Sequence, residues 1–435
     1  MKKGSVLVAV ILLLTGLMTI GVALTSAVTS SSIKIQNQYK RLSALAYAEA
    51  GVNKALWKIN TGDLSYATAS NGILETDVSG GQYRVKVVSC SGASDCKYIE
   101  STGYLPTEAR PDATKTVRVK LNGVQNVTTL NFNYSAQSNS NEIRMDNNAV
   151  IKGSAYSFGP IRMNNGSTIT GNATSAGTTP TTSYIGGTDG SIISGNGSAY
   201  TITPSNMVKG VRTSGVYPAQ QGTPIAAADM EDTITTWEAS ATAGSVFNGN
   251  KTITGTNNAL GPIQINGDLN ISNNSELRVT GTIWVQGNIN VSNNAKVYLD
   301  PSFGNNSGLV IADYKTDRNN QNKGLINLSN GVTISGTDKN NPKTPSFLLM
   351  FSTQKSSDWD YNPAISASNN IHGGVYYAPY GSYAQSNVAQ IRAVIANGII
   401  LRNNAVLDYD GNWGNSGIST GPAGKWTITE WLILN

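Results

Sequence analysis

The longest uncharged stretch of the chain lies at its N-terminus and runs without a break into an amphipathic segment. Residues 6–28 include twenty-three residues and no charge. As a helix they would be about 34 Å long, which is enough to span a bilayer with some tilt. Apolar residues then recur at helical spacing as far as Ile59, and Asn60-Thr61-Gly62-Asp63 ends the pattern. We therefore predict one long helix over 5–59 that leaves a membrane and continues into water.

The charges that flank this stretch predict its orientation. Lys2 and Lys3 precede it, and the next charge is Lys34. Because positive residues tend to stay in the cytoplasm, the C-terminal bulk of the chain is expected outside the cell. A cleaved secretory signal is the alternative, with small residues for cleavage at 25–27. The apolar stretch is longer than a usual signal core, and helical character persists beyond it, so we favour a retained single-pass anchor.

Two short motifs accompany the apolar run: KGSVLV at 3–8 and AEAG at 48–51. Together they resemble the PilX-type N-terminal segment of type IV pilus assembly proteins, over about 60 of the 435 residues. The resemblance implies a short basic leader, 1–4, removed by a prepilin peptidase between Gly4 and Ser5. It also implies other pilins as partners through the N-terminal helix. The expected location is the bacterial cytoplasmic membrane, and a pilus or the cell surface after assembly.

The chain departs from that family at one position. Major pilins usually carry a glutamate at the fifth mature position, which here is Ala9. A carboxylate in hydrocarbon is costly and is usually functional. Its replacement by alanine favours a minor or accessory subunit over the main filament subunit. A pseudopilin of a type II-like secretion system is a further alternative.

Residues 60–122 change to a period of two. The segments QYRVKVVSC, KYIESTGYL and TKTVRVKL predict three antiparallel strands, and the resemblance makes this sheet a pilin-like head packed on the helix. Cys90 and Cys96 are the only two cysteines and bracket a short turn. In an oxidising exterior we expect them to form a disulfide. A zinc pair is the alternative, but two ligands without a nearby histidine are too few.

A seven-residue unit recurs beyond residue 122: apolar, any, Asn, Asn or Gly, small, any, apolar. Its copies lie at 145–151, 163–169, 271–277, 291–297, 328–334 and 401–407, with a weaker copy at 367–373. Spacings of 18 and 20 residues with short alternating strands are typical of a β-solenoid. Asparagine tolerates left-handed backbone at tight corners and can stack along the axis. We predict a mainly β fold whose larger part is a right-handed parallel β-helix; a β-sandwich is the alternative.

The repeat divides the rest of the chain. We assign the first coils to 123–173 and the later coils, with a C-terminal strand at 425–434, to 263–435. Residues 174–262 are expected to form an irregular insertion with a helix near 226–241, and the polar segment 315–323 a loop thrown out of one coil. Trp426 and Trp431 are expected to cap the coils or to dock them on the head.

Features of an enzyme are sparse. The chain has one histidine, His372, and 13% charged residues, and it lacks a glycine-rich phosphate loop, so we expect no metal, cofactor or enzyme activity. A polysaccharide-cleaving β-helix is the enzyme alternative. Its carboxylates would be Asp358 with Asp360, or Asp408 with Asp410, each pair about 6.5 Å apart along a strand.

Binding is the more plausible role. Tyr376, Tyr377, Tyr380 and Tyr383 lie close together in sequence, and exposed aromatics on a rigid face can stack on a surface glycan or anchor a host or partner-cell ligand. The net charge of +5 includes two leader lysines, and no basic block follows them, so nucleic acid is not an expected partner. The sequence therefore predicts a surface-displayed protein with a structural or adhesive role.

Overall fold

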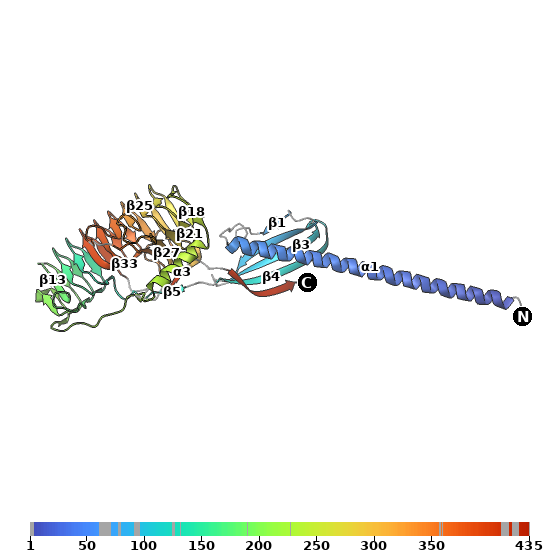
Figure 1. The fold of residues 1–435 in the computed structure, drawn as a ribbon, viewed down its shortest axis with the longest axis horizontal. Coiled ribbons are helices and arrows are strands. Elements are labelled where there is room, and N and C mark those ends of the chain that lie inside the picture. Colours follow the sequence, from blue (N-terminus) through green and yellow to red (C-terminus); the bar gives the residue numbers. More distant parts are fainter. Residues whose placement is uncertain are drawn as a thin grey trace. The chain divides into compact units, whose positions relative to one another are not determined.

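The chain forms two compact units in a computed structural model (Figure 1). The helix–sheet unit consists of Met1–Asn122 and Trp426–Asn435, and the parallel-strand unit of Gly123–Lys425. The structure describes residues 4–60, 71–76, 80–90, 96–123, 127–130, 132–188, 190–226, 228–355, 358, 360–409, 417–419 and 426–434.

The helix–sheet unit contains one long helix against an antiparallel sheet. Helix α1 (Gly4–Asn60) has 57 residues, close to the predicted 5–59. The sheet has five strands in the order β1 (Ile73–Glu75), β2 (Gln82–Ser89), β3 (Cys96–Pro106), β4 (Pro111–Gly123) and β38 (Trp426–Leu434). The C-terminal half of α1 lies on this sheet, and its N-terminal half extends beyond it (Figure 1).

Small residues allow α1 to touch the sheet at backbone distance. Ala44, Ala48 and Ala55 are fully buried. A Cβ placed on Gly51 would lie 2.2 Å from Ser101 Oγ, and one placed on Gly103 would lie 2.0 Å from the carbonyl oxygen of Ala44. The AEAG segment thus serves packing here, because its first and last residues face the sheet.

The C-terminal strand belongs to this sheet, which corrects the expectation that 263–435 forms one unit. Thr427 Oγ1 donates to the carbonyl of Asn122, and Thr429 Oγ1 to that of Lys120, so β38 runs antiparallel to β4. The backbone N–H of Trp426 donates to Asn60 Oδ1 at the end of α1 (2.7 Å). Without β38, the outer edge of β4 would expose unpaired backbone N–H and C=O groups, and β38 pairs with them. The parallel-strand unit is therefore inserted between two neighbouring strands of the sheet.

Three ladders of parallel strands build the larger unit, with each strand paired to the strand one repeat away. The first ladder consists of β18 (Val246–Phe247), β21 (Ile263–Ile265), β24 (Ile283–Val285), β27 (Gly308–Ala312), β30 (Leu348–Ser352), β33 (Val375–Ser386), β35 (Ala393–Arg402), β6 (Ala136–Ser138), β9 (Ala155–Ser157), β12 (Ala173–Ser175), β15 (Gly197–Ser198) and β17 (Arg212–Thr213).

The second ladder contains β19 (Lys251–Ile253), β22 (Leu269–Ile271), β25 (Ile289–Ser292), β28 (Ile326–Ser329), β31 (Ile365–Ser368), β33, β35, β7 (Ile143–Met145), β10 (Ile161–Met163), β13 (Tyr184–Gly187) and β16 (Thr201–Thr203). The third contains β20 (Asn258–Leu260), β23 (Glu276–Val279), β26 (Lys296–Leu299), β29 (Thr333–Ser335), β32 (His372–Gly373), β34 (Gln390–Ile391), β36 (Val406–Asp408), β8 (Val150–Lys152), β11 (Thr168–Ile169) and β14 (Ile192–Ile193). Their inward aliphatic side chains form one continuous core.

The order of the strands in space differs from their order in sequence. The stack runs from residue 246 to residue 408, and residues 136–213 then continue it. At this seam Ile399 pairs with Ile143 and Val406 with Val150. The chain therefore enters the stack in its middle, and its entry and exit strands β5 (Val127–Thr129) and β37 (Gly417–Ser419) pair antiparallel.

Asparagines at the corners form a continuous row along the stack. Seven side-chain hydrogen bonds link eight residues, each with positive φ, in the order Asn273, Asn293, Asn330, Asn369, Asn387, Asn403, Asn147 and Asn165. Left-handed backbone is tolerated best by glycine and asparagine. The corner function predicted for the repeat is thus present, and the row crosses the seam without interruption. Its copy at Asn387 was not recognised in the sequence, because Val388 occupies the second corner position at φ 61°.

The irregular insertion is shorter than the expected 174–262. Strands β12 to β17 continue the ladders to Thr213, and β18 resumes them at Val246, because the short Gly–Ser–Thr segments there still place one aliphatic inward per turn. The connection between them, residues 214–245, leaves the ladders, and we call it the strap. It returns along one side of the strands from the β13 end (Figure 1). It contains α3 (Met230–Thr242), close to the helix expected near 226–241.

Candidate functional site

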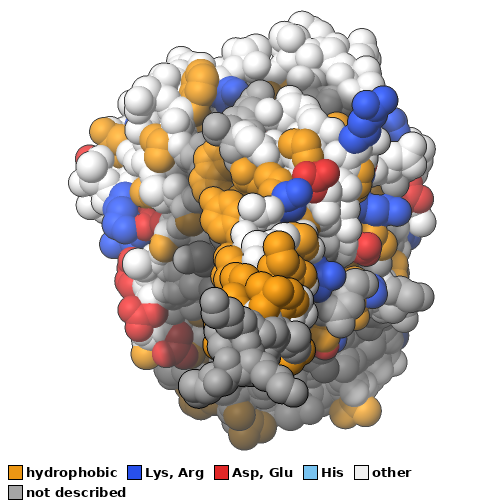
Figure 2. Space-filling model, turned by 90° about the vertical axis from the view of Figure 1, so that its right-hand side faces the viewer, with side chains coloured by type: hydrophobic (Ala, Val, Ile, Leu, Met, Phe, Trp, Pro, Cys, Tyr) orange, Lys and Arg blue, Asp and Glu red, His pale blue; other side chains and the backbone are white. Residues whose placement is uncertain are grey.

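The apolar surface of α1 is the first candidate site. Its large aliphatic side chains from Leu7 to Leu42 are about half to three-quarters exposed, and Figure 2, viewed toward the N-terminal end, shows hydrophobic side chains gathered there. By length and composition α1 is the one helix among the described residues that could span a membrane. Four threonine hydroxyls, on Thr15, Thr19, Thr25 and Thr29, bond to carbonyls one turn back, which leaves the surface apolar.

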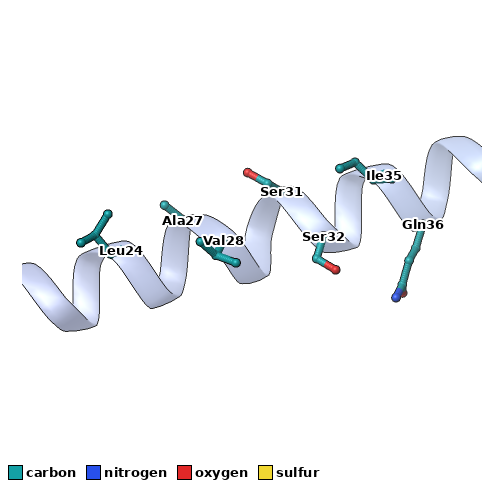
Figure 3. Close-up of a pocket in the computed structure, with 7 residues that line it drawn as sticks. All are labelled: Leu24, Ala27, Val28, Ser31, Ser32, Ile35 and Gln36. Atoms are coloured by element: carbon teal, nitrogen blue, oxygen red, sulfur yellow. The ribbon is translucent and has the colours of Figure 1, made fainter.

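A shallow hollow lies on this helix at Leu24, Ala27, Val28, Ser31, Ser32, Ile35 and Gln36. Figure 3 shows that all seven side chains project from the same helix. The hollow is therefore an open helix face that another apolar helix can fill, and it offers no enclosed space for a small molecule.

The predicted processing and disulfide residues lie in the same unit. Gly4 and Ser5 are the first two residues of α1, and cleavage between them stays a prediction. The remaining leader residues, 1–3, lie outside the described part of the chain. Cys90 and Cys96 form a disulfide with a Cα–Cα distance of 5.4 Å, and the N–H of Cys90 donates to the carbonyl of Cys96. The bond joins the end of β2 to the start of β3.

The four tyrosines do not form an exposed binding surface, so that part of the expectation is wrong. Tyr376, Tyr377 and Tyr383 are fully buried. The side chains of β33 alternate between the core inside the ladders and a second core under α3, so both faces of the strand are covered. Tyr380 is half-buried and donates to Glu231 Oε1 on α3 (2.9 Å). Burial, together with that carboxylate, raises the pKa of Tyr380 to about 12.

Two of the four aspartates weighed as catalytic groups hold the seam. Asp360 bonds to Arg144 on one side of it (2.8 Å) and to Arg402 on the other (2.7 Å). Burial raises the pKa of Asp360, but the two guanidinium groups outweigh that effect and hold it below its usual value. Asp408 bonds to Lys343 (2.7 Å) and reaches Lys152 across the seam (3.4 Å).

The other two aspartates complete no catalytic pair among the described residues. Asp358 is exposed, and Asp410 lies outside the described part of the chain. His372 is half-buried in the third ladder, where it pairs with Thr333 and Gln390. The absence of enzyme activity stays a prediction.

A partly buried ionic cluster beside α3 was missed by the sequence analysis. Asp313 is fully buried and accepts two hydrogen bonds from Arg318 (2.8 and 2.9 Å). Arg318 also bonds to Glu231 (2.7 Å), and Lys315 pairs with Glu238. The segment 315–323 is a largely exposed polar loop outside the ladders, as expected, but the side chain of Arg318 is only 13% exposed and lies against Asp313. The sequence offered one sign of this cluster, namely basic residues in the loop, Lys315 and Arg318, and acidic residues in the expected helix near 226–241.

The cluster contains two carboxylates with opposite pKa shifts. Burial raises the pKa of Glu238 to about 7, and the neighbouring Asp313 adds to the shift. Burial also disfavours ionised Asp313, but the Arg318 guanidinium and the Glu238 carboxyl hold its pKa below the usual value. Below about pH 7 the proton therefore resides on Glu238, while Asp313 stays ionised. The ion pairs of the cluster join Glu231 and Glu238 of α3 to Arg318 and Lys315, so the cluster holds α3 against the ladders.

Comparison with known proteins gives little further information. No protein family and no curated protein matches the sequence. Among solved structures, the competence-associated pilin ComZ from Thermus thermophilus is 10% identical, with 91% of this chain and 97% of that chain covered and a TM-score of 0.29. A TM-score of this size does not establish a shared fold.

Proposed function

We propose that this chain is a membrane-anchored minor pilin-like subunit of a type IV pilus or a related assembly. In this proposal the parallel-strand unit is a right-handed β-helix held outside the cell as a structural or adhesive surface. The observation that carries the proposal is the division of α1 into two halves. One half packs on a sheet through Gly51 and Gly103, and the other exposes an apolar surface with no partner among the described residues.

The exposed half of α1 suits two environments in turn. In the membrane its aliphatic side chains contact lipid, and after assembly they pack against the helices of other pilins. Gly16 and Gly21 lie in this exposed half, and small residues allow the backbones of neighbouring helices to approach closely. A prepilin peptidase, the membrane and other pilins are therefore the proposed partners, and nucleic acid is not among them.

The ion pairs of the candidate catalytic aspartates favour a display role for the parallel-strand unit over a catalytic role. Asp360 and Asp408 each contact two cations of this chain, so they hold strands together. We propose accordingly that the unit is no polysaccharide-cleaving enzyme. Incubation of the full-length protein with polysaccharides should release no reducing ends, and release that Asp360→Asn or Asp408→Asn abolishes would establish the enzyme instead.

Mass spectrometry of the mature N-terminus tests the proposed processing. Co-expression with a prepilin peptidase should give a chain that begins at Ser5, and Gly4→Glu should leave the leader in place. Gly21→Ala is the matched control, because its Cβ has open space and lies far from the cleavage position. A mature chain that begins near residue 28 would end the proposal. Recovery in sheared pili, as opposed to a secretion complex, separates the pilus subunit from the pseudopilin.

A further inference from the structure

The segment at one end of the stack carries several exposed apolar side chains. In the described part of the parallel-strand unit, eight large hydrophobic side chains are exposed, and four of them lie between residues 200 and 217: Tyr200, Val211, Val216 and Tyr217. Scattered exposed hydrophobics need no explanation, but a cluster of them marks a contact surface. We call these four residues, with Arg212, the end patch.

The end patch lies where the ladders stop. β17 pairs with β15, and β16 pairs with β13, and neither strand has a described partner on its outer edge. Met207 and Val208 close the core behind it and are almost fully buried. The patch is therefore a rigid outer surface, and its exposure does not come from an open core.

The two tyrosines are fixed in position. Their rings stack with a centroid distance of 4.6 Å and an interplanar angle of 16°. The backbone of Tyr200 donates to Ser183 Oγ (2.8 Å) and accepts from the N–H of Gly215 (2.9 Å). Tyr217 stays 44% exposed and Tyr200 36% exposed despite these bonds. Rigid aromatic rings bind with little loss of side-chain entropy, because no rotamer has to be selected.

The charged residues within the segment that carries the end patch are both positive, and Asp189 and Asp229 flank this segment in sequence. Residues 190–228 contain no Asp or Glu, and their only charged residues are Lys209 and Arg212. Arg212 is exposed, and among the described residues it forms no ion pair. An unpaired guanidinium can form a bidentate contact with a carboxylate. Two cations are too few for the phosphate backbone of a nucleic acid.

We propose that the end patch binds an acidic polysaccharide, with sugar rings against Tyr200 and Tyr217 and a carboxylate against Arg212. Four apolar side chains between glycines, serines and threonines offer less area than the roughly 800 Å² that each partner buries in a typical protein interface. A sugar chain needs a smaller surface, and the hydroxyls of Thr213 and Ser214 lie within the same segment to serve it. The inference rests on the proposed display of this unit outside the cell.

Binding of polygalacturonate to the purified full-length protein in detergent tests the proposal, with neutral dextran as the comparison. Tyr217→Ala should weaken binding at least tenfold, and Arg212→Gln should remove the preference for polygalacturonate over dextran and the dependence on salt. Tyr361→Ala is the matched control, because that tyrosine is 81% exposed in another part of the unit. Its binding should equal that of the wild type.

Three results would overturn the proposal: no binding of polygalacturonate by the wild type, equal loss in Tyr361→Ala, or unchanged binding in both patch variants. Thermal melts of each variant exclude unfolding as the cause of a loss, and Tyr217→Phe should retain binding because it keeps the ring. Recovery of the same variants in sheared pili distinguishes the two proposals. A wild type that binds but does not assemble refutes the pilin role alone, and one that assembles without binding refutes the end patch alone.

Discussion

The two units of this protein hold themselves together in opposite ways. In the helix–sheet unit, one contact between α1 and the sheet depends on a few positions without a side chain, above all Gly51 and Gly103. In the parallel-strand unit, stability is spread over repeated coils that add a few aliphatics, backbone pairs and, along much of the stack, an asparagine corner. One added methyl group should therefore disrupt the helix–sheet unit, whereas a single substitution in the parallel-strand unit should lower its free energy of unfolding only slightly.

The largest expected effect is a methyl group on Gly103. Gly103→Ala places a Cβ 2.0 Å from the carbonyl oxygen of Ala44, so helix and sheet must separate, at a cost of about 3 kcal/mol or more. Hydrogen exchange should show loss of protection in α1 and β3 while the parallel strands stay protected. Gly16→Ala is the control and should protect α1 slightly, because its Cβ meets no atom. Equal effects of the two changes would contradict the close contact.

A pH titration of unfolding tests whether Glu238 and its ionic cluster contribute more to the stability of the parallel-strand unit than a single coil does. Glu238 has a pKa of about 7 when folded, above its usual 4.5, so the folded state holds this proton more tightly than the unfolded state. Its contribution to the free energy of unfolding is complete below pH 4.5 and is lost as the pH rises through about 7, which amounts to about 3 kcal/mol.

The same titration needs a control for the other titrating groups. Glu238→Gln keeps the shape of the side chain and should flatten urea stability between pH 5 and 7.5. Asp313 acts in the opposite sense at lower pH, because its lowered pKa gives stability that is lost as the pH falls through that value. A wild type whose stability is constant from pH 5 to 7.5 would contradict the buried pair.

The disulfide should act locally within the first unit. The two cysteines are six residues apart, and a loop of that length stabilises by about 2 kcal/mol in the chain-entropy account. The double change Cys90→Ser with Cys96→Ser should therefore expose the ends of β2 and β3 to hydrogen exchange and leave the contact between α1 and Gly103 protected. Loss of protection throughout the sheet would make the bond a global constraint.

The smallest expected effect is at an asparagine corner. Asn403→Ala removes side-chain bonds to Asn147 (2.9 Å) and Asn387 (3.2 Å) and places alanine at φ 53°, at a cost of about 1.5 kcal/mol. Asn403→Gly retains the backbone conformation and should lose less. Urea unfolding of the parallel-strand unit measures both. If Asn403→Ala and Asn403→Gly lower the free energy of unfolding equally, the loss comes from the side-chain hydrogen bonds and not from the left-handed backbone conformation.

The sequence predicted local structure well and long-range order poorly. Periodicity placed α1, the strands between 82 and 121 and the asparagine corners, because each depends on neighbouring residues. The stacking of Ile143 on Ile399 depends on contacts between distant segments, and the coils have interchangeable patterns. The alternation of apolar and polar residues at 425–434 predicted a strand, but it did not indicate that this strand, β38, pairs with β4.

Errors about the site have a similar origin. Tyr376 and Tyr377 were expected on a surface because aromatic clusters often lie there, but VYYAPY is a continuous apolar run and indicates a strand buried on both faces. Glu238 and Asp313 come together only because α3 folds back over the ladders. The right-handed β-helix itself stays a proposal, supported by the three parallel ladders.

The antiparallel pair of β5 and β37 also has a mechanical consequence. Val127 lies opposite Ser419, so both connections to the sheet leave the inserted unit from the same end of the pair. A pull on the far end of the stack loads both strands in the same direction, and the tension divides between two covalent paths without shearing them apart. Tension carried along α1 and its sheet, in turn, has no need to pass through the inserted unit. A load applied to α1 and its sheet alone should therefore leave the inserted unit unstretched.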